Sequence, residues 1–460
     1  MIEICEQFGN WRLPMLPDKY VRGVIKLHQN NYYTLTLDSS LSDDFNKYDV
    51  LVGEVRGQKL TLLNVYINTI DTVNLKLSNF NYGFQECLIG DHYFNINEIS
   101  FDNVNANLGV GFVEWFAEPL KIEEISEYYN KKSTIRQIGL GHFDSIEIIA
   151  IPSFKWRHSR TKLNLEMECI VKISCEHKIN FSKLLQFIDS FSALISILSN
   201  NKIIPHDISF VAENQANSIT YFSNTRPPDL VNNIGFTFIT YQNVKPILSD
   251  ILATWFKNQD KFDIISYVLQ LLIDPTYNVP VELKFTQIAQ ASEAFHRRFL
   301  DSSGTSSSRK EAIKPYLDYL HALFKHEKKC CSVDSGLQKL INNKLRFAHE
   351  LTFGDRLNQL INELPNQIKS ITLVNIPKFT ETITQIRNYY THWDETNKNN
   401  FSFQKIHDFT ETLRVLLLIS LLKYIGLTDA VLIDAFNRYK YVCFNRSLLE
   451  NVQRADNLED

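Results

Sequence analysis

The chain has 460 residues, of which 44% are hydrophobic and 12% aromatic, and its formal net charge is -4. This length allows two or three domains with their own cores, and this composition excludes an intrinsically disordered chain. The near balance of acidic and basic residues also excludes a protein that is basic along its whole length. The charge is uneven, however, because residues 1–244 carry -6 and residues 245–460 carry +2, so the C-terminal part is the better place for an anionic ligand.

The seven cysteines are widely scattered and show no C-x-x-C spacing, which speaks against a disulfide framework and against a structural zinc site. The N-terminus lacks the basic and apolar regions of a signal peptide. The apolar run at 415–422, interrupted by Ser420, is far shorter than the ~20 residues that span a bilayer. We therefore expect a soluble, cytoplasmic protein without a membrane partner.

The first part of the chain is predicted to be rich in β-strands, because its hydrophobic period is two. A hairpin is expected over Gly53–Leu62, with Gly57 and Gln58 at the turn. Strands at such short spacing predict an antiparallel sandwich or a barrel. The predicted strands are Val21–Leu27, Tyr32–Leu37, Val50–Val55, Leu60–Tyr66, Thr72–Leu77, Phe84–Leu88, His92–Phe101 and Ile146–Ile151.

One helix is expected inside this β-rich region. Phe181–Leu198 has apolar residues at helical spacing, and Asn180 is placed to cap its N-terminus. The strands predicted around it are Leu163–Ile173, Ile203–Val211, Ser218–Phe222 and Phe236–Ile239. The pattern thus predicts a β-rich N-terminal domain over residues 1–244 with an inserted helix.

Beyond residue 245 the apolar spacing becomes helical and predicts an all-α bundle, so the fold class is a multidomain α+β protein. Asp301–Ser308 has the composition of a flexible loop. The last long helix is apolar over most of its circumference and must be enclosed, either by the bundle or by a subunit interface. The predicted helices are Asp250–Phe256, Ile264–Leu272, Phe285–Leu300, Tyr316–Lys325, Leu337–Leu345, Leu357–Leu364 and Phe403–Tyr424.

A further helix, Lys378–Trp393, ends in the sequence Arg-Asn-Tyr-Tyr-Thr-His. Helical periodicity places Asn388, Thr391 and His392 on its polar face with Arg387 at the edge, opposite an apolar stripe. An always-charged guanidinium beside an imidazole suits acid–base chemistry on a phosphodiester. The alternative interpretation is a solvated helix face that happens to carry these residues. The stripe consists of Phe379, Ile383, Ile386 and Tyr390.

A helical C-terminal domain with Arg387-Asn388 and His392 just before its last long apolar helix resembles the HEPN superfamily. Members of that superfamily carry R-x4-6-H, often with Asn directly after the Arg. The β-rich domain in front makes the chain similar to the ApeA-like branch of bacterial anti-phage proteins. The hairpin Gly53–Leu62, the helix Gln290–Arg297 and the pair Ile376-Pro377 also look like that branch.

The resemblance implies a metal-independent endoribonuclease of abortive infection that needs no cofactor. The ribose 2′-OH attacks the adjacent phosphate and leaves a 2′,3′-cyclic phosphate. His392 is the implied general acid or base, Arg387 binds the scissile phosphate, and Asn388 orients His392 or the phosphate by hydrogen bonds. Glu293 is the implied supporting residue; its alternative role is a surface ion pair with Arg297. The implied partners are RNA, with tRNA among the options, a second copy bound through the C-terminal helices, and a phage-derived activator at the N-terminal domain.

Some HEPN proteins carry a Tyr two residues after the His, which a partner nucleotidyltransferase modifies. Asp394 occupies that position here, so we expect control to lie with the N-terminal domain instead. Two other functions stay open. The chain could be a catalytically silent HEPN dimer that acts as a binding or scaffold module. Its N-terminal sandwich could bind carbohydrate or protein, which a coherent patch of exposed aromatic side chains would favour.

Overall fold

The computed structural model divides into two compact units, Met1–Lys257 and Asn258–Asp460. The division follows the helix α5 (Leu248–Lys257), thirteen residues after the change of composition at 244/245. This helix belongs to the first unit because Phe256 stacks on Phe143 of strand β9, with ring centroids 5.6 Å apart. The structure describes residues 6–27, 33–42, 46–73, 76–95, 100–116, 137–158, 163–211, 218–226, 237–301, 305–330, 336, 339–340, 343, 350–372, 376–392 and 401–443.

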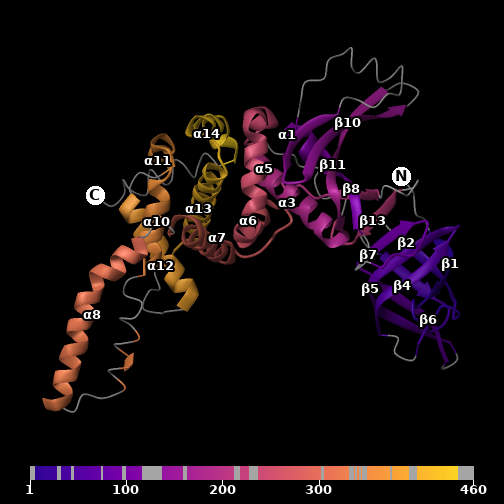
Figure 1. The fold of residues 1–460 in the computed structure, drawn as a ribbon, viewed down its shortest axis with the longest axis horizontal. Helices are drawn as coiled ribbons and strands as arrows, with labels where there is room; N and C mark the ends of the chain where they lie inside the picture. The colour runs from indigo at the N-terminus through magenta and orange to yellow at the C-terminus, as the bar shows by residue number, and fades with distance from the viewer. Residues whose placement is uncertain are drawn as a thin grey trace. The chain divides into compact units, whose positions relative to one another are not determined.

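Six antiparallel strands at the start of the chain form a closed barrel (Figure 1). They follow the order β4-β1-β2-β3-β6-β5, and pairing of β5 with β4 closes the ring. The barrel, rather than the sandwich, is therefore the architecture of this part. Its strands are β1 Gln7–Arg12, β2 Val21–Leu27, β3 Tyr33–Leu37, β4 Lys47–Val55, β5 Gln58–Val73 and β6 Lys76–Gly83.

The predicted hairpin is present between β4 and β5, but its turn lies one residue earlier than predicted. Val55 pairs with Gln58, so the two-residue loop is Arg56-Gly57. Both loop residues have positive φ, 50° and 82°. That conformation is the one that matches the twist of two antiparallel strands, and glycine adopts it without steric cost.

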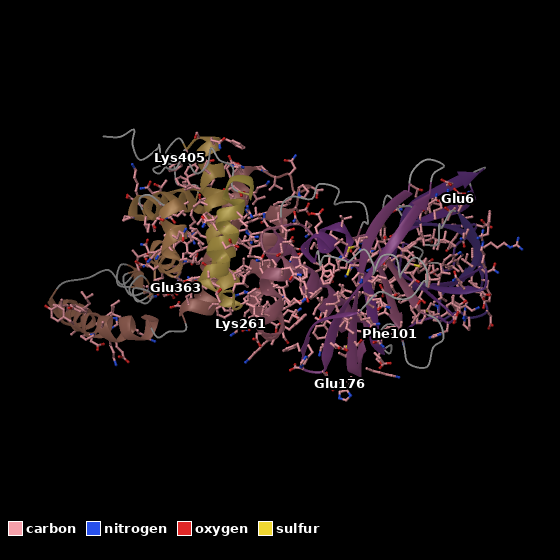
Figure 2. The ribbon with its side chains drawn as sticks, turned by 90° about the horizontal axis from the view of Figure 1, so that it is seen from above. Glu6, Phe101, Glu176, Lys261, Glu363 and Lys405 are labelled. Carbon is pink, nitrogen blue, oxygen red and sulfur yellow. The ribbon has the colours of Figure 1, made fainter. Side chains whose placement is uncertain are left out.

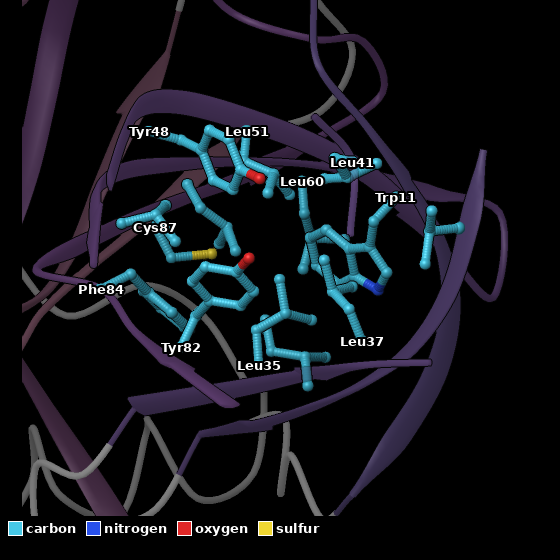
Figure 3. Close-up of a cluster of buried hydrophobic side chains, with 14 of the residues drawn as sticks. Trp11, Leu35, Leu37, Leu41, Tyr48, Leu51, Leu60, Tyr82, Phe84 and Cys87 are labelled. Carbon is cyan, nitrogen blue, oxygen red and sulfur yellow. The ribbon is translucent and has the colours of Figure 1, made fainter. Parts of the chain in front are cut away.

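The barrel interior is filled by large apolar side chains that the strand alternation sends inward (Figure 3). Trp11 is fully buried among them, and Trp115 is fully buried elsewhere in the unit. Gly53 faces the Trp11 indole so closely that an added Cβ would collide with its ring. Glycine is therefore required there for a close approach.

The sheet continues beyond the barrel, because β5 also pairs with β7. The added strands follow the order β7-β13-β12-β8-β11-β10-β9, and all their pairings are antiparallel. A short helix, α1 (Gly109–Phe116), was not predicted. The strands are β7 Glu86–Gly90, β8 Ser100–Asn107, β9 Ile138–Phe143, β10 Ile146–His158, β11 Leu163–Asn180, β12 His206–Val211 and β13 Ile219–Ser223.

The inserted helix is α3, Phe181–Ser199, and the side chain of Asn180 accepts a hydrogen bond from the Lys183 amide at 2.8 Å, as predicted for its N-cap. The strand predicted at Phe236–Ile239 is wrong. Phe236 lies outside the described residues, and the Phe238 and Ile239 amides donate to the last carbonyls of α3 instead. Their hydrogen bonds thus complete a helix end, which leaves none for a sheet.

Helix α3 is long and apolar enough to span a bilayer by length and composition, but 72% of the window concerned is buried inside the fold. A core helix passes the same test. Two predicted strands also differ from the structure. Thr72–Leu77 covers the end of β5 and the start of β6. Of His92–Phe101, the described residues 92–95 are not strand, and β8 includes Ser100 and Phe101. Thr72 pairs with Leu77 and Val73 pairs with Lys76, so the first of these segments is a hairpin between two strands and not a single strand.

The second unit is the predicted bundle of helices (Figure 1). Its last long helix, α13, spans Phe403–Tyr424 as predicted, and Ser402 caps it by accepting from the Lys405 amide. Leu413–Leu422 is buried within the single chain, so the bundle itself encloses this segment. The helices are α6 Gln259–Ile273, α7 Val281–Phe295, the π-helix η2 His296–Leu300, α8 Thr305–Cys330, α10 Phe353–Asn362, α11 Asn366–Thr372, α12 Ile376–His392, α13 and α14 Asp429–Cys443.

The far end of α13 is tied to the end of α10. Lys423 Nζ donates to the Glu363 carbonyl at 2.9 Å, and Figure 2 shows Lys405 and Glu363 at opposite ends of α13. The loop predicted at Asp301–Ser308 is shorter in the structure, because α8 already begins at Thr305. The predicted helix Leu337–Leu345 lies largely outside the described residues.

Candidate active site

Helix α12 is the platform of the site, and its predicted apolar stripe faces the bundle. Phe379, Ile383 and Ile386 are buried, and the Phe379 ring meets Phe409 of α13 edge-on with centroids 5.7 Å apart. Tyr390, at the end of the stripe, is half-buried. The stripe orients the helix, so that its other face carries Arg387 and Asn388.

Helix α10 crosses α12 closely because a glycine lies at the crossing. A Cβ on Gly354 would stand 3.3 Å from Thr384 Oγ1 and 3.6 Å from Thr380 Cγ2. The Thr380 hydroxyl donates to Asn358 Oδ1 at 2.8 Å, which ties the two helices together. The close crossing brings Phe353, the neighbour of Gly354, against the side chain of Arg387.

Arg387 is held by three contacts from three helices. Its Nη2 lies 3.2 Å from Glu293 Oε2 on α7, and its Nη1 donates to Asn388 Oδ1 at 3.3 Å. Its Cζ stands 5.6 Å from the centre of the Phe353 ring, within the range of a cation–π contact. The Arg387 side chain is nevertheless 25% exposed. The guanidinium is therefore fixed in position and still open to a ligand from solvent.

The Glu293 carboxylate contacts two arginine side chains. Its Oε1 accepts from Arg297 Nε at 3.2 Å and from Nη2 at 3.0 Å, which is the predicted i,i+4 pair. Its Oε2 faces Arg387, 94 residues away in the chain. With only 17% of its side chain exposed, this carboxylate joins two arginines at one place.

A buried polar network lies beside this cluster. His296 is fully buried, and its Nε2 lies 2.6 Å from Gln359 Oε1, so the pairing assigns the ring proton to Nε2. The opposite nitrogen, Nδ1, accepts from Arg356 Nη1 at 3.1 Å, and the same Nη1 donates to Asp301 Oδ2 at 2.7 Å. Burial lowers the pKa of His296, and the charge of Arg356 lowers it further, which outweighs the hydrogen bond to Gln359. This histidine is therefore neutral.

The network and the arginine cluster share the same two helical segments. Glu293 and His296 are three residues apart where α7 passes into the π-helix, and Phe353 and Arg356 are three residues apart on α10. Residues at this spacing lie on one face. Single π-helical turns occur often at functional sites. The buried network thus fixes the two segments that position Arg387.

The remaining motif residues complete the end of α12. Tyr389 and Tyr390 are half-buried and meet edge-on with ring centroids 5.0 Å apart, as packing residues do. Burial, and next the charge of Glu282, raises the pKa of Tyr390. His392 is the last residue of α12, one turn beyond Asn388, but its side chain lies outside the described residues. The helix thus places its backbone on the Asn388 face.

Several residues of this site had no signal in the sequence. Phe353 and Arg356 lie in the first turn of α10, before the predicted start of this helix at Leu357, and nothing marked them as neighbours of Arg387 or His296. Their i, i+3, i+7 spacing with Leu360, which places all three on the inner face of α10, was the one available hint. Within the described ranges no group of three or more His, Cys, Asp or Glu residues could hold a metal ion. The expectation that the chemistry needs no metal stays a prediction.

Comparison with protein families gives two matches. Residues 6–255 match ApeA N-terminal domain 1, which is more than half of the chain, and residues 286–431 match Apea-like HEPN. The second range contains Glu293, Phe353 and the segment Arg387–His392. A search of curated proteins found no match, and a search of solved structures found none.

Proposed function

The chain belongs to the ApeA-like HEPN family, and on that premise we propose that it is a metal-independent endoribonuclease of an anti-phage, abortive-infection system. The observation that carries the proposal is the fixed guanidinium of Arg387. Arg387 lies near the C-terminal end of α12, and this helix ends five residues later at His392. Phosphate binding and proton transfer are the two requirements for cleaving RNA through its own 2′-OH.

The proposed reaction has one bond formed and one broken. His392 takes the proton of the ribose 2′-OH, and the 2′ oxygen attacks the adjacent phosphorus. The 5′ oxygen of the next nucleotide leaves and takes up a proton. The products are a 2′,3′-cyclic phosphate and a 5′-OH. An imidazole suits both proton transfers because its pKa is ordinarily near neutrality.

Arg387 suits the charge that develops on the phosphate. A guanidinium gives a phosphate two parallel hydrogen bonds, and it stabilises a transition state best when its position is fixed beforehand. Glu293, Asn388 and Phe353 supply that fixation. Because Asn388 Oδ1 accepts from Arg387, its amide nitrogen remains to donate to the phosphate or to His392.

We further propose a cytoplasmic homodimer, joined through the C-terminal helices, whose two motifs face each other across one cleft. The second copy would then supply the acid that protonates the 5′ oxygen. RNA, with tRNA among the options, is the proposed substrate. Control by a phage-derived activator is assigned to the β-rich N-terminal domain, because Asp394 replaces the tyrosine at which other HEPN proteins are modified.

One observation favours the alternative of a silent scaffold dimer. Arg387 is already paired with the Glu293 carboxylate, which offsets the charge that a phosphate would need. If that pair persists, the site binds no phosphodiester and the domain acts through assembly alone. The two proposals differ in whether RNA is cut.

Inducible expression of the wild type and of His392→Ala, followed by end-mapping of total RNA, separates them. The matched control is His321→Ala, since His321 is an exposed histidine on α8 of the same unit. A nuclease gives growth arrest and new cyclic-phosphate ends with the wild type and the control only. Identical RNA ends in all three cultures would contradict the nuclease.

A further inference from the structure

We propose that Arg297 binds the RNA phosphate next to the scissile one, so that the site holds two successive phosphates of a single strand. This inference rests on the proposed nuclease function and extends it. It assigns a subsite for one further nucleotide to a residue outside the Arg387–His392 motif. The chemistry that it would recognise is the phosphodiester backbone, independent of the base.

The two arginines are held on either side of one carboxylate. Glu293 Oε2 faces Arg387 at 3.2 Å, and Glu293 Oε1 accepts from Arg297 at 3.0 and 3.2 Å. Each oxygen serves a different guanidinium, so the two cations are close but directed apart. A single strand of RNA presents its charges at a similarly short, regular spacing. Two fixed guanidinium groups therefore suit two neighbouring phosphates better than they suit a single phosphate.

Arg297 keeps one edge of its guanidinium open. Its Nε and Nη2 both donate to Glu293 Oε1, so Glu293 occupies the side of the guanidinium that these two nitrogens form. Its Nη1 makes no hydrogen bond to the described residues, and Glu350 Oε2 approaches Nη2 only to 3.8 Å. The end edge formed by Nη1 and Nη2 is the one that takes a phosphate with two hydrogen bonds.

Exposure increases from the first arginine to the second. The Arg387 side chain is 25% exposed and that of Arg297 is 49% exposed. A strand whose scissile phosphate reaches Arg387 must leave towards solvent, and the neighbouring cation on that side is Arg297. Glu350, with a 38% exposed side chain, is a weak competitor because exposed ion pairs contribute little.

The next residue, Arg298, is a matched control. It has the same charge and lies on the same π-helical turn, but its Nη1 donates to the Lys261 carbonyl and to Asp263 at the start of α6. Its guanidinium is thus directed away from Glu293. A substitution at Arg298 removes one positive charge from the same π-helical turn without touching the proposed subsite.

The test is the salt dependence of RNA binding, measured in the His392→Ala background with a mixed-sequence, single-stranded oligoribonucleotide. Each lost phosphate contact lowers the slope of log K against log salt by ~0.7 for a single strand. Arg297→Ala is expected to lower the slope by that amount, and Arg298→Ala is expected to leave it unchanged. In the otherwise wild-type enzyme, Arg297→Ala should raise KM severalfold with kcat retained, because it removes binding and no chemistry.

Three outcomes would overturn the inference. Equal slopes for Arg297→Ala and for its parent show that no phosphate contact was lost. Equal losses for Arg297→Ala and Arg298→Ala show general electrostatic attraction only. A fall in kcat with an unchanged slope shows that Arg297 acts through Glu293 on Arg387. In each of these cases, the nuclease proposal still holds if the wild type cleaves RNA and the cleavage depends on Arg387. A wild type that neither binds nor cuts RNA would contradict both the nuclease proposal and the Arg297 subsite.

Discussion

The most informative stability prediction concerns Arg356, which is 3% exposed and donates to both His296 and Asp301. The change Arg356→Met keeps most of the volume but removes the donor, so the partly buried Asp301 carboxylate and the buried His296 ring nitrogen lose their partner. Breaking a buried pair on one side costs about 3–5 kcal/mol. Asp301 is 18% exposed, so water partly solvates it and the lower end of that range, about 3 kcal/mol, applies.

The assay is thermal unfolding followed by circular dichroism. For a unit of about this size, 1 kcal/mol shifts the melting temperature by roughly 2–4 °C, so Arg356→Met should lower it by roughly 6–12 °C. The control is Arg298→Met, whose 35% exposed side chain pairs with exposed Asp263 and should cost less than about 1 kcal/mol.

The double variant Arg356→Met/Asp301→Leu sharpens the test. If the two residues interact as described, removing both leaves no unpaired charge, and the double variant loses less stability than the sum of the single variants. Strict additivity, or a melting temperature of Arg356→Met equal to that of Arg298→Met, would refute the reasoning.

Three further predictions follow from the contacts. Glu293→Gln removes the charged partner of Arg387, and since a lost charged hydrogen bond costs about 1–3 kcal/mol, single-turnover RNA cleavage should fall roughly 10- to 100-fold. Folding lowers the pKa of His296 below its ordinary 6.5, so the folded state binds fewer protons; the free energy of unfolding in urea should be highest above pH 6.5 and decline below it, and His296→Gln should lose that decline. Gly53→Ala drives a Cβ into the Trp11 indole and should destabilise the barrel by about 1–3 kcal/mol, seen as an earlier change in tryptophan fluorescence on unfolding.

Each of these predictions has a result that would contradict it. A wild-type cleavage rate in Glu293→Gln would remove Glu293 from the site. The same pH dependence of unfolding in His296→Gln and the wild type would show that another group titrates. Gly139→Ala is the control for the barrel, since a Cβ there meets nothing within 4 Å. Equal unfolding of Gly53→Ala and Gly139→Ala would contradict the close packing on Trp11.

Local patterns in the sequence were sufficient for the elements whose bounds depend on their own residues. The strand Val21–Leu27 and the helix Phe403–Tyr424 have the predicted bounds, and Asn180 caps α3 as predicted. Each of these depends on the period of its own apolar residues or on one adjacent cap. Helix α1 was missed because its eight residues, with two glycines, are too few to show a period.

Contacts between distant segments could not be predicted from the sequence. The Glu293–Arg387 pair joins residues 94 apart, and the position of Phe353 depends on how closely Gly354 lets two helices cross. Nothing in the periodicity of either helix specifies that crossing. The motif residues were found because three of them are close together in the chain, whereas the Glu293 carboxylate and the Phe353 ring reach Arg387 only in the folded bundle.

Cleavage of RNA by the purified protein in EDTA tests the central claim most directly, with wild type, Arg387→Ala and His392→Ala compared at equal concentration. We expect the wild type to cut RNA and leave 2′,3′-cyclic phosphate ends, and both variants to remain folded and be inactive. Cleavage by either variant at the wild-type rate, or wild-type cleavage that stops in EDTA, would contradict it.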